Sequence, residues 1–137
     1  MRPLKLTVLW HTVGLAYLAL VIYGSLTPSP PDLSTFPGAD KGVHLTVYAG
    51  MMLWFGFLYQ SRRSVLVLGA LFVALGIVLD LLQGTTGYRS MELLDMVANT
   101  IGVLIGGLLS RTRIGLALSR LEQLILEGGE SSEEIDS

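Results

Sequence analysis

Residues 64–82, SVLVLGALFVALGIVLDLL, decide the fold class of this chain. This stretch contains a single charged residue, Asp80, and is close to the roughly 20 residues that a helix needs to cross a hydrocarbon core of about 30 Å. Three further apolar stretches lie at residues 4–26, 43–59 and 92–109. We therefore predict an all-α membrane protein with four transmembrane helices within residues 1–110.

The composition supports this class and excludes several others. Of the 137 residues, 51% are hydrophobic and only 15% are charged, whereas a soluble domain has about 25% charged residues. The mean hydropathy is +0.61. The chain has no cysteine, which excludes disulfides and thiolate chemistry. Because it also has no dinucleotide-binding glycine pattern, P-loop or basic nucleic-acid patch, we expect no cofactor and no nucleic-acid partner.

Positive charges are segregated along the chain. Seven basic residues lie before or at the start of the first apolar stretch, between the second and third stretches, or after the fourth: Arg2, Lys5, Arg62, Arg63, Arg111, Arg113 and Arg120. The alternate loops, residues 28–41 and 84–91, contain only Lys41 and Arg89 as basic residues. By the positive-inside rule, both termini are cytoplasmic and these two loops face outward. We expect the first stretch to be a retained anchor, since its apolar run is long for a signal peptide.

The end of the chain differs from the spans. Within residues 111–127, one helical face collects Ile114, Leu118, Leu121 and Ile125, which predicts an amphipathic helix. This segment is too short and too charged to span, so we expect it to lie in the cytoplasmic interface or to pack on a partner protein. Residues 128–137 are acidic, with glycine and serine, and predict a solvated, disordered tail.

Polar residues are concentrated near one end of three predicted spans. The sequence also predicts where these helices end: Asp40 and Ser90 are expected N-caps, and residues 84–87 are expected to break the helix. If consecutive spans alternate in direction, the polar ends of the three spans lie at the same membrane face. Ionisable groups near hydrocarbon are costly, so they need a partner or a task. The predicted site consists of Asp40, Lys41, His44, Tyr48, Asp80, Gln83, Arg89, Asp95 and Asn99.

This set of residues fits three kinds of role. As a binding site, Lys41 and Arg89 would take a phosphate or carboxylate of an amphiphilic envelope ligand, and Tyr48 would line the pocket. As an enzyme, His44 would be the general acid or base, although no nucleophile has an evident motif. As structure, the same groups would form a hydrogen-bonded clamp between helices, at about 0.6 kcal/mol for each bond.

Two further interpretations concern metals and partners. A metal site is the weakest, because His44 and Asp40 supply two ligands where zinc usually takes three or four from protein. The chain could instead be a structural accessory subunit of a larger membrane complex, held through the C-terminal amphipathic segment. Membrane lipid is the expected partner in every case.

The spacing of these residues resembles a known family. Asp40-Lys41-x2-His44-x3-Tyr48, followed by Gln83 and then by Arg89-x5-Asp95-x3-Asn99-x2-Gly102, is similar to the VanZ-like family of small bacterial membrane proteins. Members usually carry Glu-x-x-Gln at the end of the third helix, where this chain has a shorter carboxylate in Asp80-x-x-Gln83.

The resemblance implies a location and a setting but no reaction. It implies a multi-pass protein of the bacterial cytoplasmic membrane with an outward-facing site for envelope components. The family takes its name from a member associated with resistance to the glycopeptide antibiotic teicoplanin, which implies a link to antibiotic resistance. It supplies no established biochemical activity, so the ligand and the chemistry stay open.

Overall fold

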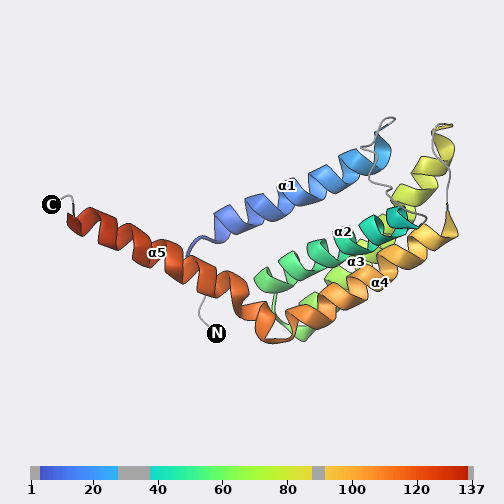
Figure 1. Cartoon of the computed structure of the whole chain (residues 1–137). Coiled ribbons are helices and arrows are strands. Elements are labelled where there is room, and N and C mark those ends of the chain that lie inside the picture. Colours follow the sequence, from blue (N-terminus) through green and yellow to red (C-terminus); the bar gives the residue numbers. More distant parts are fainter. Residues whose placement is uncertain (1–3, 28–37, 88–91, 136–137) are drawn as a thin grey trace.

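The computed structural model describes residues 4–27, 38–87 and 92–135, and these ranges are helical with no β-strand (Figure 1). Five α-helices and one short 3₁₀ segment account for them. Their bounds are Thr7–Leu26 (α1), Ala39–Leu58 (α2), Arg62–Thr85 (α3), Leu93–Ser110 (α4), Arg113–Leu116 (η1) and Ala117–Ile135 (α5).

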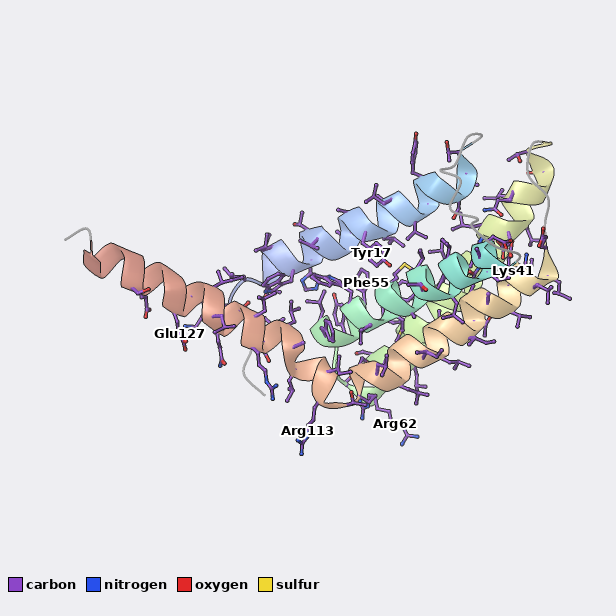
Figure 2. The ribbon with its side chains drawn as sticks, in the orientation of Figure 1. Tyr17, Lys41, Phe55, Arg62, Arg113 and Glu127 are labelled. Atoms are coloured by element: carbon purple, nitrogen blue, oxygen red, sulfur yellow. The ribbon has the colours of Figure 1, made fainter. Side chains whose placement is uncertain are left out.

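Helices α1 to α4 run side by side along one direction, and α5 leaves them at an angle (Figure 1). The closest pair is α2 and α4, and α2 also contacts α1 and α3. The core gathers on this central helix, where Tyr48, Met51, Met52 and Phe55 are buried. Tyr17 and Phe55 lie between α1 and α2, and the Tyr17 hydroxyl donates to the Val47 carbonyl at 2.8 Å (Figure 2).

Three of the described helices, α1, α3 and α4, are long and apolar enough to cross a bilayer. The chain is therefore a membrane protein, as its composition predicts. The helix α2 has the length of a span but is less apolar, because Asp40, Lys41 and His44 lie in its first two turns. The leucines, valines and isoleucines of α3 and α4 that face away from the bundle are largely exposed, as lipid-facing residues must be.

Glycines determine which helices touch. A Cβ atom added at Gly102 would lie 2.3 Å from the Leu45 carbonyl oxygen, and one at Gly106 would lie 2.3 Å from the Ala49 carbonyl oxygen. Only glycine allows the backbones of α4 and α2 to approach so closely. A glycine also lies in the contact between α3 and α4, because Gly76 of α3 packs against Asn99 of α4.

The helix ends differ from the predicted ones in two described places. The residue that precedes α2 is Gly38, at φ 84°, and Asp40 lies in the first turn instead of capping it. A left-handed backbone is favourable for glycine, which explains why the helix begins there. The second expected cap, Ser90, lies outside the described residues; the residue that precedes α4 is Glu92, whose side chain makes no capping bond.

The C-terminal segment is more regular than predicted. An amphipathic helix was expected to end near residue 127 and a disordered tail to follow, yet α5 continues to Ile135. The helix continues through Gly128 and Gly129, and the glutamates on either side of them are good helix formers. The exposed apolar side chains of α5 are Leu121, Leu124 and Ile125, in agreement with an amphipathic surface.

One carboxylate ties α5 to the first helix. Glu122 is buried and accepts hydrogen bonds from the backbone amides of Lys5 and Leu6, at 2.6 and 2.9 Å, and from Trp10 Nε1 at 2.7 Å. Burial by itself raises the pKa of Glu122, but these three bonds and the nearby charge of Lys5 outweigh it and lower the pKa. The carboxylate therefore provides acceptors for backbone amides at the start of α1 that have no partner within the helix.

Candidate functional site

The bundle brings most of the predicted site residues to one end. Lys41 lies at the end of the bundle opposite Arg62 and Arg113 (Figure 2). The helices alternate in direction, so the first turns of α2 and α4 meet the last turns of α3 there. Arg89 lies outside the described residues, and its predicted role stays a prediction. We call the connected residues the polar cluster: Asp40, Lys41, His44, Asp80, Glu92, Asp95 and Asn99.

Lys41 is the centre of the exposed half of the polar cluster. Its ammonium lies 2.8 Å from Asp40 Oδ2 and 3.1 Å from Asp95 Oδ1, and it also pairs with Glu92. These contacts join the first turn of α2 to the start of α4. Three carboxylates surround one ammonium, so the immediate neighbourhood of Lys41 is net negative.

A second half of the polar cluster is buried between α2, α3 and α4. His44 Nδ1 lies 3.0 Å from Asn99 Oδ1, and Asn99 Nδ2 donates to Asp80 Oδ2 at 3.3 Å. Since a carbonyl oxygen only accepts, this arrangement places the proton of His44 on Nδ1. The other ring nitrogen, Nε2, then points toward Asp95 Oδ2, 3.8 Å away.

Asp95 connects the two halves. The residue is buried, and its Oδ2 atom faces His44 while its Oδ1 atom faces Lys41. The Oδ1 atom is shielded from solvent and makes no hydrogen bond to the described residues, although the Lys41 ammonium lies near it. The Lys41 ammonium, 3.1 Å away, is the positive partner of this buried oxygen, so Asp95 ties the start of α4 to both Lys41 and His44 of α2.

The two remaining predicted residues lie beside the polar cluster without a described bond to it. Tyr48 is 3% exposed and packs over Gly76, next to Asn99, so it closes the inner side of the buried half. Gln83 donates to the Ser25 carbonyl at 2.7 Å and thereby links the end of α3 to the end of α1. Gln83 therefore has a described role in holding α1, which the sequence did not suggest.

Glu92 is a cluster member that the predicted site set omitted. It precedes Asp95 by three residues, so both carboxylates face the same direction at the start of α4. This spacing in the sequence could have indicated that Glu92 belongs to the site. The structure agrees, because Lys41 pairs with both carboxylates.

The carboxylates of Asp40, Glu92 and Asp95 also have the spacing of a cation site. One oxygen atom of each lies within 4.8 Å of the others. Carboxylate oxygens suit hard cations such as Ca²⁺ or Mg²⁺. In the described arrangement the Lys41 ammonium supplies the positive charge at this point, so a metal ion would have to displace it.

Chemically, the polar cluster can accept hydrogen bonds and positive charge at the rim of the bundle. Among the described residues it holds four carboxylates, one lysine and one histidine. Searches of protein-family models, curated proteins and solved structures found no match to this chain. The interpretation of the site therefore depends on these residues and their geometry.

Proposed function

We propose that the polar cluster is the headgroup site of a four-span membrane protein that binds an amphiphilic ligand of the bacterial envelope. The proposed ligand is a lipid, a lipid-linked precursor or a lipoglycopeptide. The observation that carries the proposal is the crowding of Asp40, Glu92 and Asp95 around Lys41, above a buried chain of hydrogen bonds. Structural clamping needs a pair or two of such bonds, and this cluster has more.

The fourth span in this proposal is α2. It has 20 residues, so it is about 30 Å long, which matches the hydrocarbon core. It contacts α1, α3 and α4 and contains most of the buried core. A helix enclosed by other helices tolerates polar residues that a lipid-facing helix would not, because they find partners in the bundle.

The orientation follows from the charges at the two ends of the bundle. Arg62, Arg63, Arg111 and Arg113 belong to the end opposite Lys41. The positive-inside rule assigns the arginine end to the cytoplasm. The polar cluster then faces outward, where envelope precursors and antibiotics are encountered. The similarity of its residues to the VanZ-like motif supports the same side and the same class of ligand.

The charge balance favours a particular headgroup. Lys41 already pairs with three carboxylates, so an added anion at that point would meet net negative charge. An ammonium or amide donor would instead find acceptors, first among them the exposed carboxylates of Asp40 and Glu92. Arg89, predicted to take a phosphate or carboxylate, would complete the site for a zwitterionic ligand.

Native mass spectrometry of the full chain in a mild neutral detergent tests the proposal. The probes are phosphatidylethanolamine, whose ammonium has three donors, and phosphatidylcholine, whose quaternary ammonium has none. We expect the chain to retain phosphatidylethanolamine preferentially, and Asp95→Asn to lose that preference by about ten-fold or more. Glu127→Gln is the matched control, because it removes one charge from an exposed residue of α5.

Thermal unfolding of the same samples separates binding from structure. A binding role predicts that Asp95→Asn unfolds close to the wild type while losing the preferred lipid. Equal retention of both lipids by the wild type, together with a large loss of stability in Asp95→Asn, would reduce the cluster to a structural clamp.

A second candidate function is that of an accessory subunit. The observation in its favour is the apolar surface of α5, where Leu121, Leu124 and Ile125 are 46–67% exposed. Replacing Leu121 and Leu124 by glutamate would remove a defined partner from affinity-purified membranes if α5 docks on it. Retention of the same partner by this variant would contradict a docking role for α5.

A further inference from the structure

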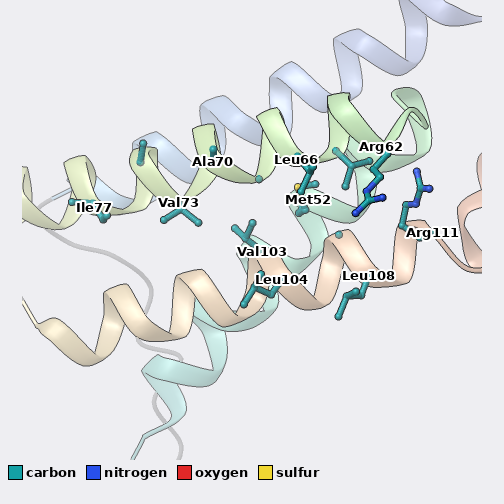
Figure 3. A pocket seen from close by; sticks show the side chains of 14 residues that line it. Met52, Arg62, Leu66, Ala70, Val73, Ile77, Val103, Leu104, Leu108 and Arg111 are labelled. Atoms are coloured by element: carbon teal, nitrogen blue, oxygen red, sulfur yellow. The ribbon is translucent and has the colours of Figure 1, made fainter.

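A long apolar groove runs between α3 and α4 (Figure 3). Its volume is about 740 Å³, within the roughly 300–1,000 Å³ range of small-molecule sites. Met52 of α2 forms part of its floor, and small residues such as Gly69, Ala70, Ala74 and Gly107 hollow its walls. The rest of the lining is aliphatic except at one end.

That end carries two arginines. Figure 3 shows the side chains of Arg62, from the start of α3, and Arg111, from the residue after α4, at the same end of the groove, and both line it. Arg111 donates one hydrogen bond, to the Gln60 carbonyl at 2.9 Å. In the described ranges, neither arginine forms an ion pair with a carboxylate. Two neighbouring guanidinium groups without a carboxylate between them favour an anion there.

The groove and the arginines have the geometry of one lipid molecule. From Arg62 to Ile77 the lining follows 16 residues of α3, which rise by about 22 Å in an α-helix. Half of a hydrocarbon core is about 15 Å, so the groove is long enough for an acyl chain of one leaflet. An apolar groove that ends in two guanidinium groups is complementary to a phospholipid, whose acyl chain is apolar and whose headgroup contains an anionic phosphate.

We propose that this groove binds one anionic phospholipid of the leaflet at the arginine end, with an acyl chain along α3 and α4 and its phosphate between Arg62 and Arg111. By the charge rule this is the cytoplasmic leaflet. The ligand, the leaflet and the residues all differ from those of the polar cluster. The inference does not depend on the polar cluster having a ligand.

The chain offers a closely matched control for the two arginines. Arg63 adjoins Arg62 in the first turn of α3, and Arg113 follows Arg111 by two residues, yet neither lines the groove. The double variants Arg62→Gln/Arg111→Gln and Arg63→Gln/Arg113→Gln remove the same charge from the same end. Any effect on topology or on general membrane attraction is therefore common to both.

The experiment is a titration of the full chain, in neutral detergent, with dioleoyl phosphatidylglycerol and with dioleoyl phosphatidylcholine, read by native mass spectrometry. We expect one phosphatidylglycerol to bind at least about ten-fold more tightly than phosphatidylcholine. Arg62→Gln/Arg111→Gln loses this preference and Arg63→Gln/Arg113→Gln keeps it. Ala70→Trp fills the groove and weakens binding of both lipids, whereas Ala19→Trp, on the exposed surface of α1, does not.

Three results would overturn the proposal. Equal loss of preference in both double variants would mean general attraction to anionic lipid. Displacement of the lipid by inorganic phosphate alone would mean an anion site with no contribution from the groove. A dimer whose contact is broken by Ala70→Trp would mean that a second copy of the chain covers the groove.

Discussion

The carboxylate of Glu122 in α5 accepts a hydrogen bond from the indole Nε1 of Trp10 in α1, at 2.7 Å and across 112 residues of sequence. The same carboxylate also accepts hydrogen bonds from the backbone amides of Lys5 and Leu6. One side chain therefore holds the start of the first helix against the last helix of the chain. This contact is the basis of our first two predictions.

We predict that Glu122→Ala destabilises the attachment of α5 by about 2 kcal/mol or more, because it leaves two backbone amides and an indole N–H without their acceptor. Limited proteolysis after α4 measures the effect as faster cleavage of the C-terminal segment. Glu127→Gln, at an exposed position of the same helix, serves as the control and should match the wild type. Cleavage at the wild-type rate in Glu122→Ala would show that α5 is held by other contacts.

The lowered pKa of Glu122 predicts an acid-sensitive attachment. A carboxyl group with a lowered pKa in the folded state contributes stability that is fully present above its ordinary value of 4.5 and is lost as the pH falls through the lowered value. In a Trp54→Phe background, Trp10 is the single remaining indole. Its fluorescence should change below pH 4.5, and Glu122→Ala should abolish this transition. A transition of equal size in Glu122→Ala would assign it to another group.

The contact of α4 with α2 predicts a large effect at one glycine and little at another. Gly102→Ala should destabilise the bundle by about 1–3 kcal/mol, because its Cβ would meet the Leu45 carbonyl at 2.3 Å. Gly69→Ala, whose Cβ would meet only Val103 at 3.7 Å, should be neutral or stabilising by up to about 1 kcal/mol. Thermal unfolding in detergent compares the two. Similar losses in both variants would contradict the described packing of α4 on α2.

The buried half of the polar cluster predicts measurable coupling between two side chains. His44 and Asn99 share one hydrogen bond, and such bonds between membrane helices are worth about 0.6 kcal/mol. A double-mutant cycle of His44→Ala and Asn99→Ala should return a coupling free energy of that size. The pair His44 and Thr100, whose hydroxyl bonds within α4, should return none. Additive effects of His44→Ala and Asn99→Ala would mean that they do not interact.

Much of the fold could be predicted because its signals are local. An uninterrupted apolar run such as that of α3 predicts a spanning helix without knowledge of its neighbours. The meeting of Lys41 with Asp95 could also be predicted, because consecutive spans alternate and bring such residues to one end. Three of the described helices have the length and apolar composition of membrane spans, in agreement with that prediction. The family resemblance and the role of Arg89 stay predictions.

Other features could not be predicted because they depend on which helices are neighbours. A glycine stripe indicates that a helix comes close, but it does not say that Gly102 and Gly106 meet α2 instead of α3. The role of Glu122 is another such feature, since nothing in its local sequence reveals amide donors more than 100 residues away. The groove beneath Arg62 and Arg111 likewise arises from the pairing of α3 with α4.

The central position of α2 has a consequence for the order of synthesis. Its least apolar turns, around Asp40, Lys41 and His44, find their partners in α4, which the ribosome makes later. Before α4 is made, Lys41 lacks its contact with Asp95 and His44 lacks its contact with Asn99. If α2 is the fourth span, as proposed, it should therefore insert poorly in chains truncated before residue 92 and gain its position as α4 arrives. A truncation series with a topology reporter after α2 would follow this delayed insertion directly.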